Sequence, residues 1–210
     1  MTATALTRSI IGSALLCFSI SAAHAAIVNG NFEAATGGGS AAGWTDTDST
    51  FGFNRCTLIA CGSGGGSAGP SNGAAWIWFG GSPAAQTAVL SQAALIESGS
   101  SLLAFDFWAG LTSGAASLSL SIDSIVQWTV NATTASAFAA GYSTVFIPVA
   151  MFANNTARTV RWNYSDSATP GSSTNWHVDN VRLVVPEPGS LALAGLALLG
   201  LGAVRRCRKG

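Results

Sequence analysis

A strict alternation of apolar and small polar residues is the sequence feature that most restricts the fold. In residues 117–122, serine alternates with Leu118, Leu120 and Ile122, the period-two pattern of a strand with one buried and one solvent-facing side. The chain has 25 glycines, and no segment between such runs keeps a helical period. These patterns predict an all-β sandwich and not a set of βαβ units. Three further runs repeat the alternation: Leu103, Phe105 and Phe107; Val126, Trp128 and Val130; and Val160, Trp162 and Tyr164.

Four other segments are predicted strands with irregular features. Residues 75–79 are apolar at both parities, as in a strand that is buried on both sides. Residues 145–149 contain Pro148, which confines a strand to a sheet edge or lies at a strand end. Residues 26–28 form a short apolar strand that turns at Asn29-Gly30. In residues 176–185 the apolar side chains change from even to odd positions, which predicts a β-bulge near Asp179 and Asn180.

The N-terminus has the pattern of a secretory signal. Arg8 precedes an apolar stretch from residue 10 to residue 20, and Ala23-His24-Ala25 supplies an A-x-A cleavage site. We expect cleavage after Ala25, so that residues 1–25 are a signal peptide. The alternative is an N-terminal transmembrane anchor, which the shortness of the apolar run disfavours because a span needs about 20 residues.

The C-terminus is built from three parts in a fixed order. The sequence Val185-Pro186-Glu187-Pro188 leads into residues 191–204, which carry no charge, and a basic tail that contains Arg205 and Arg206 follows. The two prolines keep Glu187 out of regular structure, so that the backbone is accessible to a processing enzyme. The apolar run enters the inner membrane as a short hydrophobic helix, and the cations hold the tail in the cytoplasm.

This ending resembles the PEP-CTERM sorting domain, also known as an ice-binding-protein C-terminal domain, of Gram-negative bacteria that make exopolysaccharide. The resemblance covers residues 185–210, and the alternative is an ordinary single-span tail. It implies that an exosortase-type enzyme processes the chain near Val185, Pro186, Glu187 and Pro188. The protein would then be anchored transiently in the inner membrane before it reaches the cell envelope, the outer surface or the extracellular matrix. Whether the anchor is removed stays open.

The middle of the chain is acidic. Between Ala26 and Val185 there are four arginines and eight acids, so the formal charge is four minus eight, or −4, and lysine is absent from this stretch. The basic residues that neutralise the whole chain lie at its two ends. A nucleic-acid partner is therefore not expected.

Cys56 and Cys61 are the two cysteines of the predicted exported domain, and four residues separate them in a Gly-rich stretch. In an oxidising periplasm this spacing predicts a local disulfide rather than two free thiols. Such a short loop gains about 2 kcal/mol on the chain-entropy model. The bond would fasten the loop from Arg55 to Pro70.

Four short motifs occur in the order seen in the galactose-binding-like jelly rolls of carbohydrate-binding modules. They are Asn29–Glu33, Gly43–Thr45, Trp76–Gly81 and Val178–Val181. The resemblance implies that residues 26–184 form one antiparallel jelly-roll β-sandwich that binds sugar. It also implies a structural calcium ion held by Glu33 and Asp179, because hard carboxylate oxygens suit that ion. The alternative is a pair of ordinary surface carboxylates, and no cofactor is required for activity.

Two of the seven tryptophans are predicted to be exposed enough for a sugar ring to stack on them. Trp44 follows a flexible Gly-rich stretch, and Trp108 lies on the face opposite Phe105 and Phe107. The remaining tryptophans are expected in the core. His177 lies at a polar parity and is expected at the surface, without a nucleophile motif to make it catalytic.

Residues 45–50 alternate hydroxyl and acid once only. They are predicted to form a polar loop or an edge strand, rather than a metal loop or an ice-facing ridge.

The expected activity of the whole chain is a non-catalytic, weak association with polysaccharide or matrix. A passive structural or surface-coat protein without a ligand is the alternative, and a secreted hydrolase is a distant third.

Overall fold

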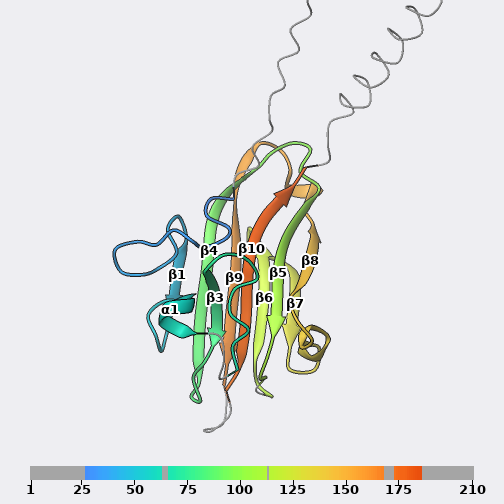
Figure 1. Cartoon of the computed structure of the whole chain (residues 1–210). Coiled ribbons are helices and arrows are strands. Elements are labelled where there is room, and N and C mark those ends of the chain that lie inside the picture. Colours follow the sequence, from blue (N-terminus) through green and yellow to red (C-terminus); the bar gives the residue numbers. More distant parts are fainter. Residues whose placement is uncertain (1–26, 63–65, 113, 168–172, 186–210) are drawn as a thin grey trace, which may run out of the picture.

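Two antiparallel five-stranded sheets pack face to face in the computed structural model, which describes residues 27–62, 66–112, 114–167 and 173–185 (Figure 1). The predicted all-β sandwich is confirmed. The first sheet has the order β1 (Thr45–Asp48), β4 (Gln86–Ile96), β9 (Thr156–Asp166), β6 (Ser117–Ile122) and β7 (Ile125–Asn131). The second has the order β2 (Arg55–Thr57), β3 (Ala75–Gly80), β10 (Asn175–Val184), β5 (Leu102–Ala109) and β8 (Ser143–Pro148).

The chain changes sheet at most of its connections, as in a jelly roll. Strands distant in sequence therefore pair in the centre of each sheet, β4 with β9 and β3 with β10. Helix is confined to short turns in the described residues. These are α1 (Leu58–Cys61) and two 3₁₀ turns, Ala135–Phe138 and Ala150–Phe152.

The core lies between the sheets and is formed mainly by inward-facing apolar side chains of the central strands. From the first sheet Leu118, Leu120 and Trp162 point inward, and all three are fully buried. From the second sheet Phe105 meets Trp162 edge-on, with 5.5 Å between the ring centroids. Trp162 is buried as predicted, whereas Trp128 is only partly buried against this core. Both sheets therefore contribute aromatic rings to one continuous core. Val126, predicted on the same buried side as Trp128 and Val130, is 60% exposed, and it pairs with Ser121 beyond a register shift between β6 and β7.

The predicted bulge in the last strand is confirmed. The register between β10 and β5 shifts between Asp179 and Arg182, and Asn180 has a positive φ of 53°. Val178 before the shift and Val181 after it are both buried in the core. The irregularity thus lets β10 present apolar side chains inward on both sides of the bulge.

Both predicted edge features are confirmed. Residues 45–48, the hydroxyl–acid alternation, form the edge strand β1 of the first sheet. Strand β8 is the edge of the second sheet and ends at Pro148. Proline is tolerated there because a strand end at a sheet edge leaves its missing N–H without consequence for the ladder. The predicted double-sided burial of residues 75–79 is also confirmed, with only Trp78 half-buried.

The predicted strand at residues 26–28 is wrong for the described residues 27 and 28, which are followed by a turn at residues 29–32. Asn29 and Phe32 have positive φ values of 50° and 58°, and Phe32 N donates to Asn29 O. Gly30 O accepts a hydrogen bond from Val181 N at 2.8 Å. A tight turn, and not a ladder, therefore joins the start of the domain to the bulge of β10.

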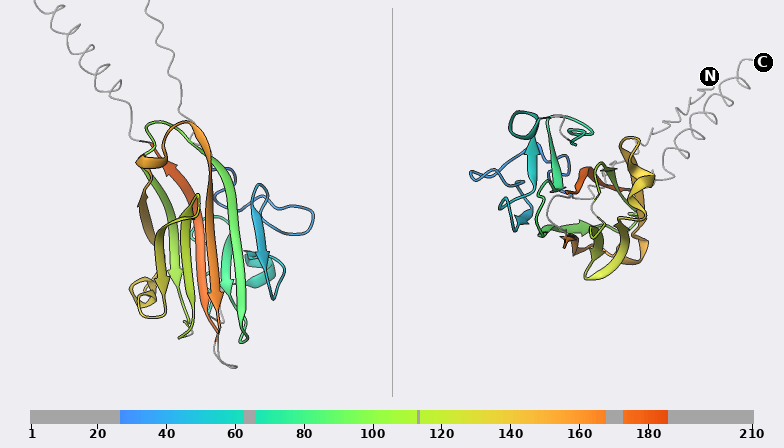
Figure 2. Two further views of the ribbon diagram at one scale, coloured as in Figure 1. Left: turned by 180° about the vertical axis from the view of Figure 1, so that it is seen from behind. Right: turned by 90° about the horizontal axis from the view of Figure 1, so that it is seen from below.

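The first and last described residues lie at the same end of the sandwich (Figures 1 and 2). Val184 pairs with Leu102 at this end, whereas Asn175 pairs with Gly80 at the other end of β10. The predicted signal helix and C-terminal hydrophobic helix fall outside the described residues, as do Pro186, Glu187, Pro188, Arg205 and Arg206. Within the described part of the chain, no helix has the length and hydrophobicity needed to span a bilayer.

Candidate ligand-binding site

A pocket of about 310 Å³ opens beside strands β2 and β3, at the edge of the second sheet. The rings of Phe51, Phe53 and Trp78 form much of its wall. Asn54, Arg55, the Cys56–Cys61 disulfide, Ala60 and the glycines at positions 80 and 81 complete it. The volume falls at the lower end of the range for small-ligand sites.

A side-chain-capped turn places Phe51 at the pocket rim. Asp48 Oδ1 accepts hydrogen bonds from Thr50 N at 2.7 Å and from Phe51 N at 2.9 Å. Gly52 follows with φ of 86°, a conformation that glycine adopts without strain. The Phe51 ring remains 55% exposed as a result.

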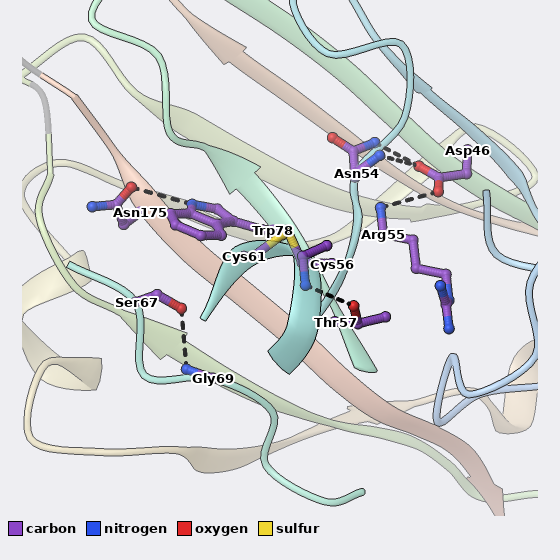
Figure 3. Close-up of a disulfide and its surroundings, with 11 residues drawn as sticks. Asp46, Asn54, Arg55, Cys56, Thr57, Cys61, Ser67, Gly69, Trp78 and Asn175 are labelled. Atoms are coloured by element: carbon purple, nitrogen blue, oxygen red, sulfur yellow. Dashed lines mark hydrogen bonds between the residues drawn. A yellow bond between two sulfur atoms is a disulfide. The ribbon is translucent and has the colours of Figure 1, made fainter. Parts of the chain in front are cut away.

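Behind the pocket, the buried Asp46 carboxylate gathers backbone and side-chain N–H groups (Figure 3). Oδ1 accepts from Asn54 N at 2.7 Å and from Asn54 Nδ2 at 2.9 Å. Oδ2 accepts from Arg55 N at 3.2 Å and from Ala41 N at 3.3 Å. A buried carboxylate that accepts several N–H bonds is well satisfied and fixes the groups that donate to it. The wall formed by residues 54–55 is therefore held firmly.

Asn54 also carries an unpaired polar atom. Its side chain is 3% exposed, and Nδ2 donates to both Asp46 Oδ1 and Thr47 O. The carbonyl oxygen Oδ1 has no hydrogen-bond partner. An unsatisfied buried acceptor costs about 1–3 kcal/mol, so a donor delivered to this atom would gain that free energy.

The predicted disulfide between Cys56 and Cys61 is confirmed, with the two Cα atoms 5.8 Å apart (Figure 3). It closes the single turn of α1, whose first N–H groups are capped by Thr57: Ala60 N donates to Thr57 Oγ1 at 3.2 Å. The bond therefore fastens α1 against strand β2, beside the pocket.

The remaining wall depends on Trp78 and on glycine. Trp78 Nε1 donates to Asn175 Oδ1 at 3.2 Å, which fixes the indole ring (Figure 3). A Cβ atom at Gly81 would lie 3.5 Å from the Trp78 ring and 3.7 Å from that of Phe51. The lack of a side chain at Gly81 thus keeps the space between the two rings open.

Arg55 lines the pocket, but its guanidinium binds a neighbouring turn. Its Nε and Nη2 donate to Phe32 O at 2.6 Å and to Glu33 O at 3.0 Å. In Figure 3 the guanidinium extends away from Trp78. The pocket therefore has a mostly apolar lining, with the Asp46 carboxylate behind one wall.

Glu33 and Asp179, the predicted calcium ligands, both bind the segment that precedes β3. Glu33 Oε1 accepts from Ala74 N at 2.8 Å and Ala75 N at 3.0 Å. Asp179 Oδ2 accepts from Ser71 N at 2.9 Å. Among the described residues, no group of three His, Cys, Asp or Glu is placed to hold a metal ion. The calcium ion stays a prediction.

The predicted surface position of His177 is wrong, because its side chain is fully buried. The ring lies among Trp76, Trp78 and Trp108, with centroids 5.6, 5.2 and 4.8 Å away. Burial lowers the pKa of His177 to about 3, so the imidazole is neutral near pH 7. Its parity was predicted correctly, since it lies on the outer face of β10 beside Asp179. The segment that covers this outer face was not predicted.

Residues 66–74 provide this cover. Tyr142 Oη lies 3.2 Å from His177 Nδ1 and donates to Gly69 O at 2.5 Å. Ser71 donates from its backbone to Asp179. Glycine and serine carry no hydrophobic pattern, so nothing in the residue pattern predicts that this segment lies on a sheet face.

Of the two predicted sugar-stacking tryptophans, Trp44 is buried and its predicted exposure is wrong. It is 7% exposed, and its ring packs between Phe32 and Trp162 at centroid distances of 5.5 and 6.0 Å. Trp108 is half-buried against His177. Sequence reasoning missed the rings at the pocket, although aromatic residues on both sides of Gly52 were a usable signal for an exposed aromatic turn.

Comparison with known protein families identifies the C-terminal segment. Residues 184–209 match the model of the PEP-CTERM protein-sorting motif. The chain carries a PEP-CTERM sorting signal. The signal begins at the last residue of β10, Val184, and includes the predicted processing residues Val185 to Pro188 and the basic tail. A protein with this PEP-CTERM signal is exported and anchored transiently.

Three solved structures are similar to this chain at low identity. A carbohydrate-binding module of family 61 in complex with β-1,4-galactotriose has a TM-score of 0.45 and 10% identity, and the match covers 77% of this chain and 99% of that one. A module specific for non-crystalline cellulose has a TM-score of 0.37 and 17% identity over 55% and 79%. Modules of the β-sandwich superfamily with promiscuous specificity have a TM-score of 0.44 and 13% identity over 75% and 63%. No curated protein matches the chain.

Proposed function

We propose that this chain is an exported, non-catalytic protein of the cell envelope or extracellular matrix that binds polysaccharide in the pocket beside β2 and β3. An exosortase-type enzyme processes it at the PEP-CTERM signal after transient anchoring in the inner membrane. The observation that carries the proposal is the aromatic pocket of Phe51, Phe53 and Trp78, on a domain that its own C-terminus addresses to the envelope.

The pocket chemistry suits a sugar ring. Aromatic faces present apolar area, and the axial C–H groups of a pyranose are the apolar part of an otherwise polar molecule. Burying this area yields about 25 cal/mol per Å². Sugar hydroxyls that do not enter the pocket stay hydrated at its open rim, where Phe51 is half-exposed. Binding of this kind is weak for one sugar and accumulates along a polymer.

The pocket also lies at a useful place relative to the sorting signal. Gly80, at the pocket, pairs with Asn175 at the start of β10, whereas the signal begins at Val184 at its end. Nine steps of about 3.3 Å separate these two points by about 30 Å along the strand. Gly80 and Gly81 therefore lie at the end of β10 opposite to the start of the sorting signal.

Affinity electrophoresis in gels that contain the exopolysaccharide of the producing bacterium tests the proposal, together with a glycan array. Wild-type protein should be retarded. Phe51→Ala should weaken retention about tenfold, because the ring forms the exposed wall of the pocket. Phe146→Ala is the matched control, since Phe146 is 56% exposed and lies on the edge strand β8.

Two results would contradict the proposal. If the wild type binds no glycan, including the host polymer, the passive surface-coat alternative is favoured. If both alanine variants lose retention equally, the contact is general hydrophobic adhesion and the pocket is not the site.

A further inference from the structure

We infer that the pocket selects sugar residues that carry a methyl group next to a hydrogen-bond donor. This inference rests on the proposed function and names the ligand class of the same pocket. The 6-deoxyhexoses and the N-acetylated amino sugars share this chemistry. In the first the donor is a neighbouring hydroxyl, and in the second it is the amide N–H.

The first argument is the lining of the pocket. Most of the lining is apolar: it comprises three aromatic residues, the disulfide, Ala60 and two glycines, and Asn54 and Arg55 are its polar members. A hydroxymethyl group placed there would lose its water and gain few hydrogen bonds, at a cost of about 1–3 kcal/mol. A methyl group has no such penalty, and its burial is favourable by about 0.8 kcal/mol. The lining therefore discriminates in favour of the methyl group.

The second argument is charge. Arg55 lines the pocket, but its guanidinium extends away from Trp78 and donates from Nε and Nη2 to Phe32 O and Glu33 O. The Asp46 carboxylate lies directly behind Asn54. A uronic acid or a sulfated sugar would therefore enter without a cationic partner and close to a like charge, which is unfavourable. The pocket thus favours a neutral sugar.

The third argument is the unpaired oxygen of Asn54. Because Nδ2 donates to Asp46 Oδ1 and Thr47 O, the amide cannot rotate without losing two hydrogen bonds. The atom left without a partner is consequently a buried acceptor, and it belongs to a residue that lines the pocket. A ligand donor reaches this oxygen only if the Asn54 side chain shifts toward the pocket. A methyl group alone leaves the oxygen unsatisfied, so the ligand must also supply a donor.

The experiment measures the affinity of the full-length protein, by isothermal titration or competition for the host polymer, for matched sugar pairs. The pairs are the free sugars 6-deoxygalactose and galactose, 6-deoxymannose and mannose, and N-acetylglucosamine and glucose. The methyl-bearing member of at least one pair should bind about fivefold more tightly or better. The pair that shows the preference identifies the source of the methyl group.

Two variants link the preference to the pocket. Phe51→Ala should reduce the ratio of affinities within the pair to near one, and Phe146→Ala should leave the ratio unchanged. Phe51 is half-exposed, so its replacement leaves the core intact.

Each contrary result has a distinct meaning. Equal affinity within every pair, or a preference for the member without the methyl group, overturns the inference while leaving polysaccharide binding in place. A preference that survives in Phe51→Ala also overturns it, because the selecting surface then lies elsewhere. Absence of binding to every sugar and to the host polymer overturns both the inference and the proposed function.

Discussion

Asp106 and Asp179 face each other across strands β5 and β10, and the single hydroxyl of Ser71 lies within hydrogen-bond distance of both. Ser71 Oγ is 2.9 Å from Asp106 Oδ2 and 3.1 Å from Asp179 Oδ2. One hydroxyl has one hydrogen, so it cannot donate to both carboxylates at once. A proton on Asp179 would complete the chain from Asp179 through Ser71 to Asp106.

The pH dependence of stability follows from this pair. Burial raises the pKa of Asp179 to about 6, against the opposing effect of its N–H donors. Because the folded state then holds the proton more tightly than the unfolded state, this group adds stability as the pH falls from about 6 to 4. The contribution is about 2 kcal/mol.

Asp179→Asn removes that contribution. The free energy of unfolding of the variant minus that of the wild type should fall by about 2 kcal/mol between pH 7.5 and 4, measured by urea denaturation. The lowered pKa of His177 reduces the stability of the folded state as the pH falls below 6.5. His177 is present in both proteins, so its effect cancels in this difference. A difference that does not change with pH would show that Asp179 titrates normally.

The turn at Gly30 should tolerate no side chain. A Cβ atom there would overlap the carbonyl oxygen of Val181, and the Gly30 carbonyl also holds Val181 N. Gly30→Ala should lower the free energy of unfolding by about 2 kcal/mol or more. Gly37→Ala is the matched control, since a Cβ at Gly37 meets nothing within 4 Å. Equal effects of the two substitutions would contradict the close approach.

Removal of the Cys56–Cys61 disulfide should have a modest effect on stability and a larger one on the pocket. The double variant Cys56→Ser, Cys61→Ser should lose about 2 kcal/mol, because the closed loop is short. Glycan retention should fall even under conditions where the double variant is fully folded, since the disulfide forms part of the pocket wall. Unchanged retention in the folded double variant would show that α1 does not shape the site.

The predicted calcium ion can be tested through Glu33. If calcium binds, a chelator lowers the melting temperature of the wild type by several degrees. Glu33→Gln keeps an oxygen to accept from Ala74 N and Ala75 N, so it should abolish the calcium effect while retaining the fold. A wild-type melting temperature that is the same with calcium and with chelator rejects the site.

Processing at the sorting signal should be visible by mass spectrometry of the native protein. We expect the mature chain to end between Val185 and Gly189, just after β10. Replacement of Glu187 by Ala within the Pro-Glu-Pro sequence should slow this cleavage. Recovery of an intact tail that includes Arg205 and Arg206 would show that the anchor is permanent.

Local signals in the sequence were sufficient for most of the strands, the bulge near Asp179, the edge position of Pro148 and the disulfide. Each depends on residues within about ten positions. Trp44 and His177 were wrongly predicted to be exposed, because the residues that bury them are distant in the sequence. Trp162 packs on Trp44, and residues 66–74 cover the face that carries His177. The pocket was missed for the same reason, since Phe51 and Trp78 meet only after β3 has taken its place in the sheet. Alternation reveals which face a side chain occupies, but not what lies over that face.

The disulfide that closes α1 is part of the pocket wall, and it can form only in an oxidising compartment. Thiols stay reduced in the cytoplasm and are oxidised in the periplasm, so Cys56 and Cys61 join only after translocation. The newly made chain therefore lacks a finished pocket wall before it is exported. On the proposed function, export is also the step that completes the site for polysaccharide.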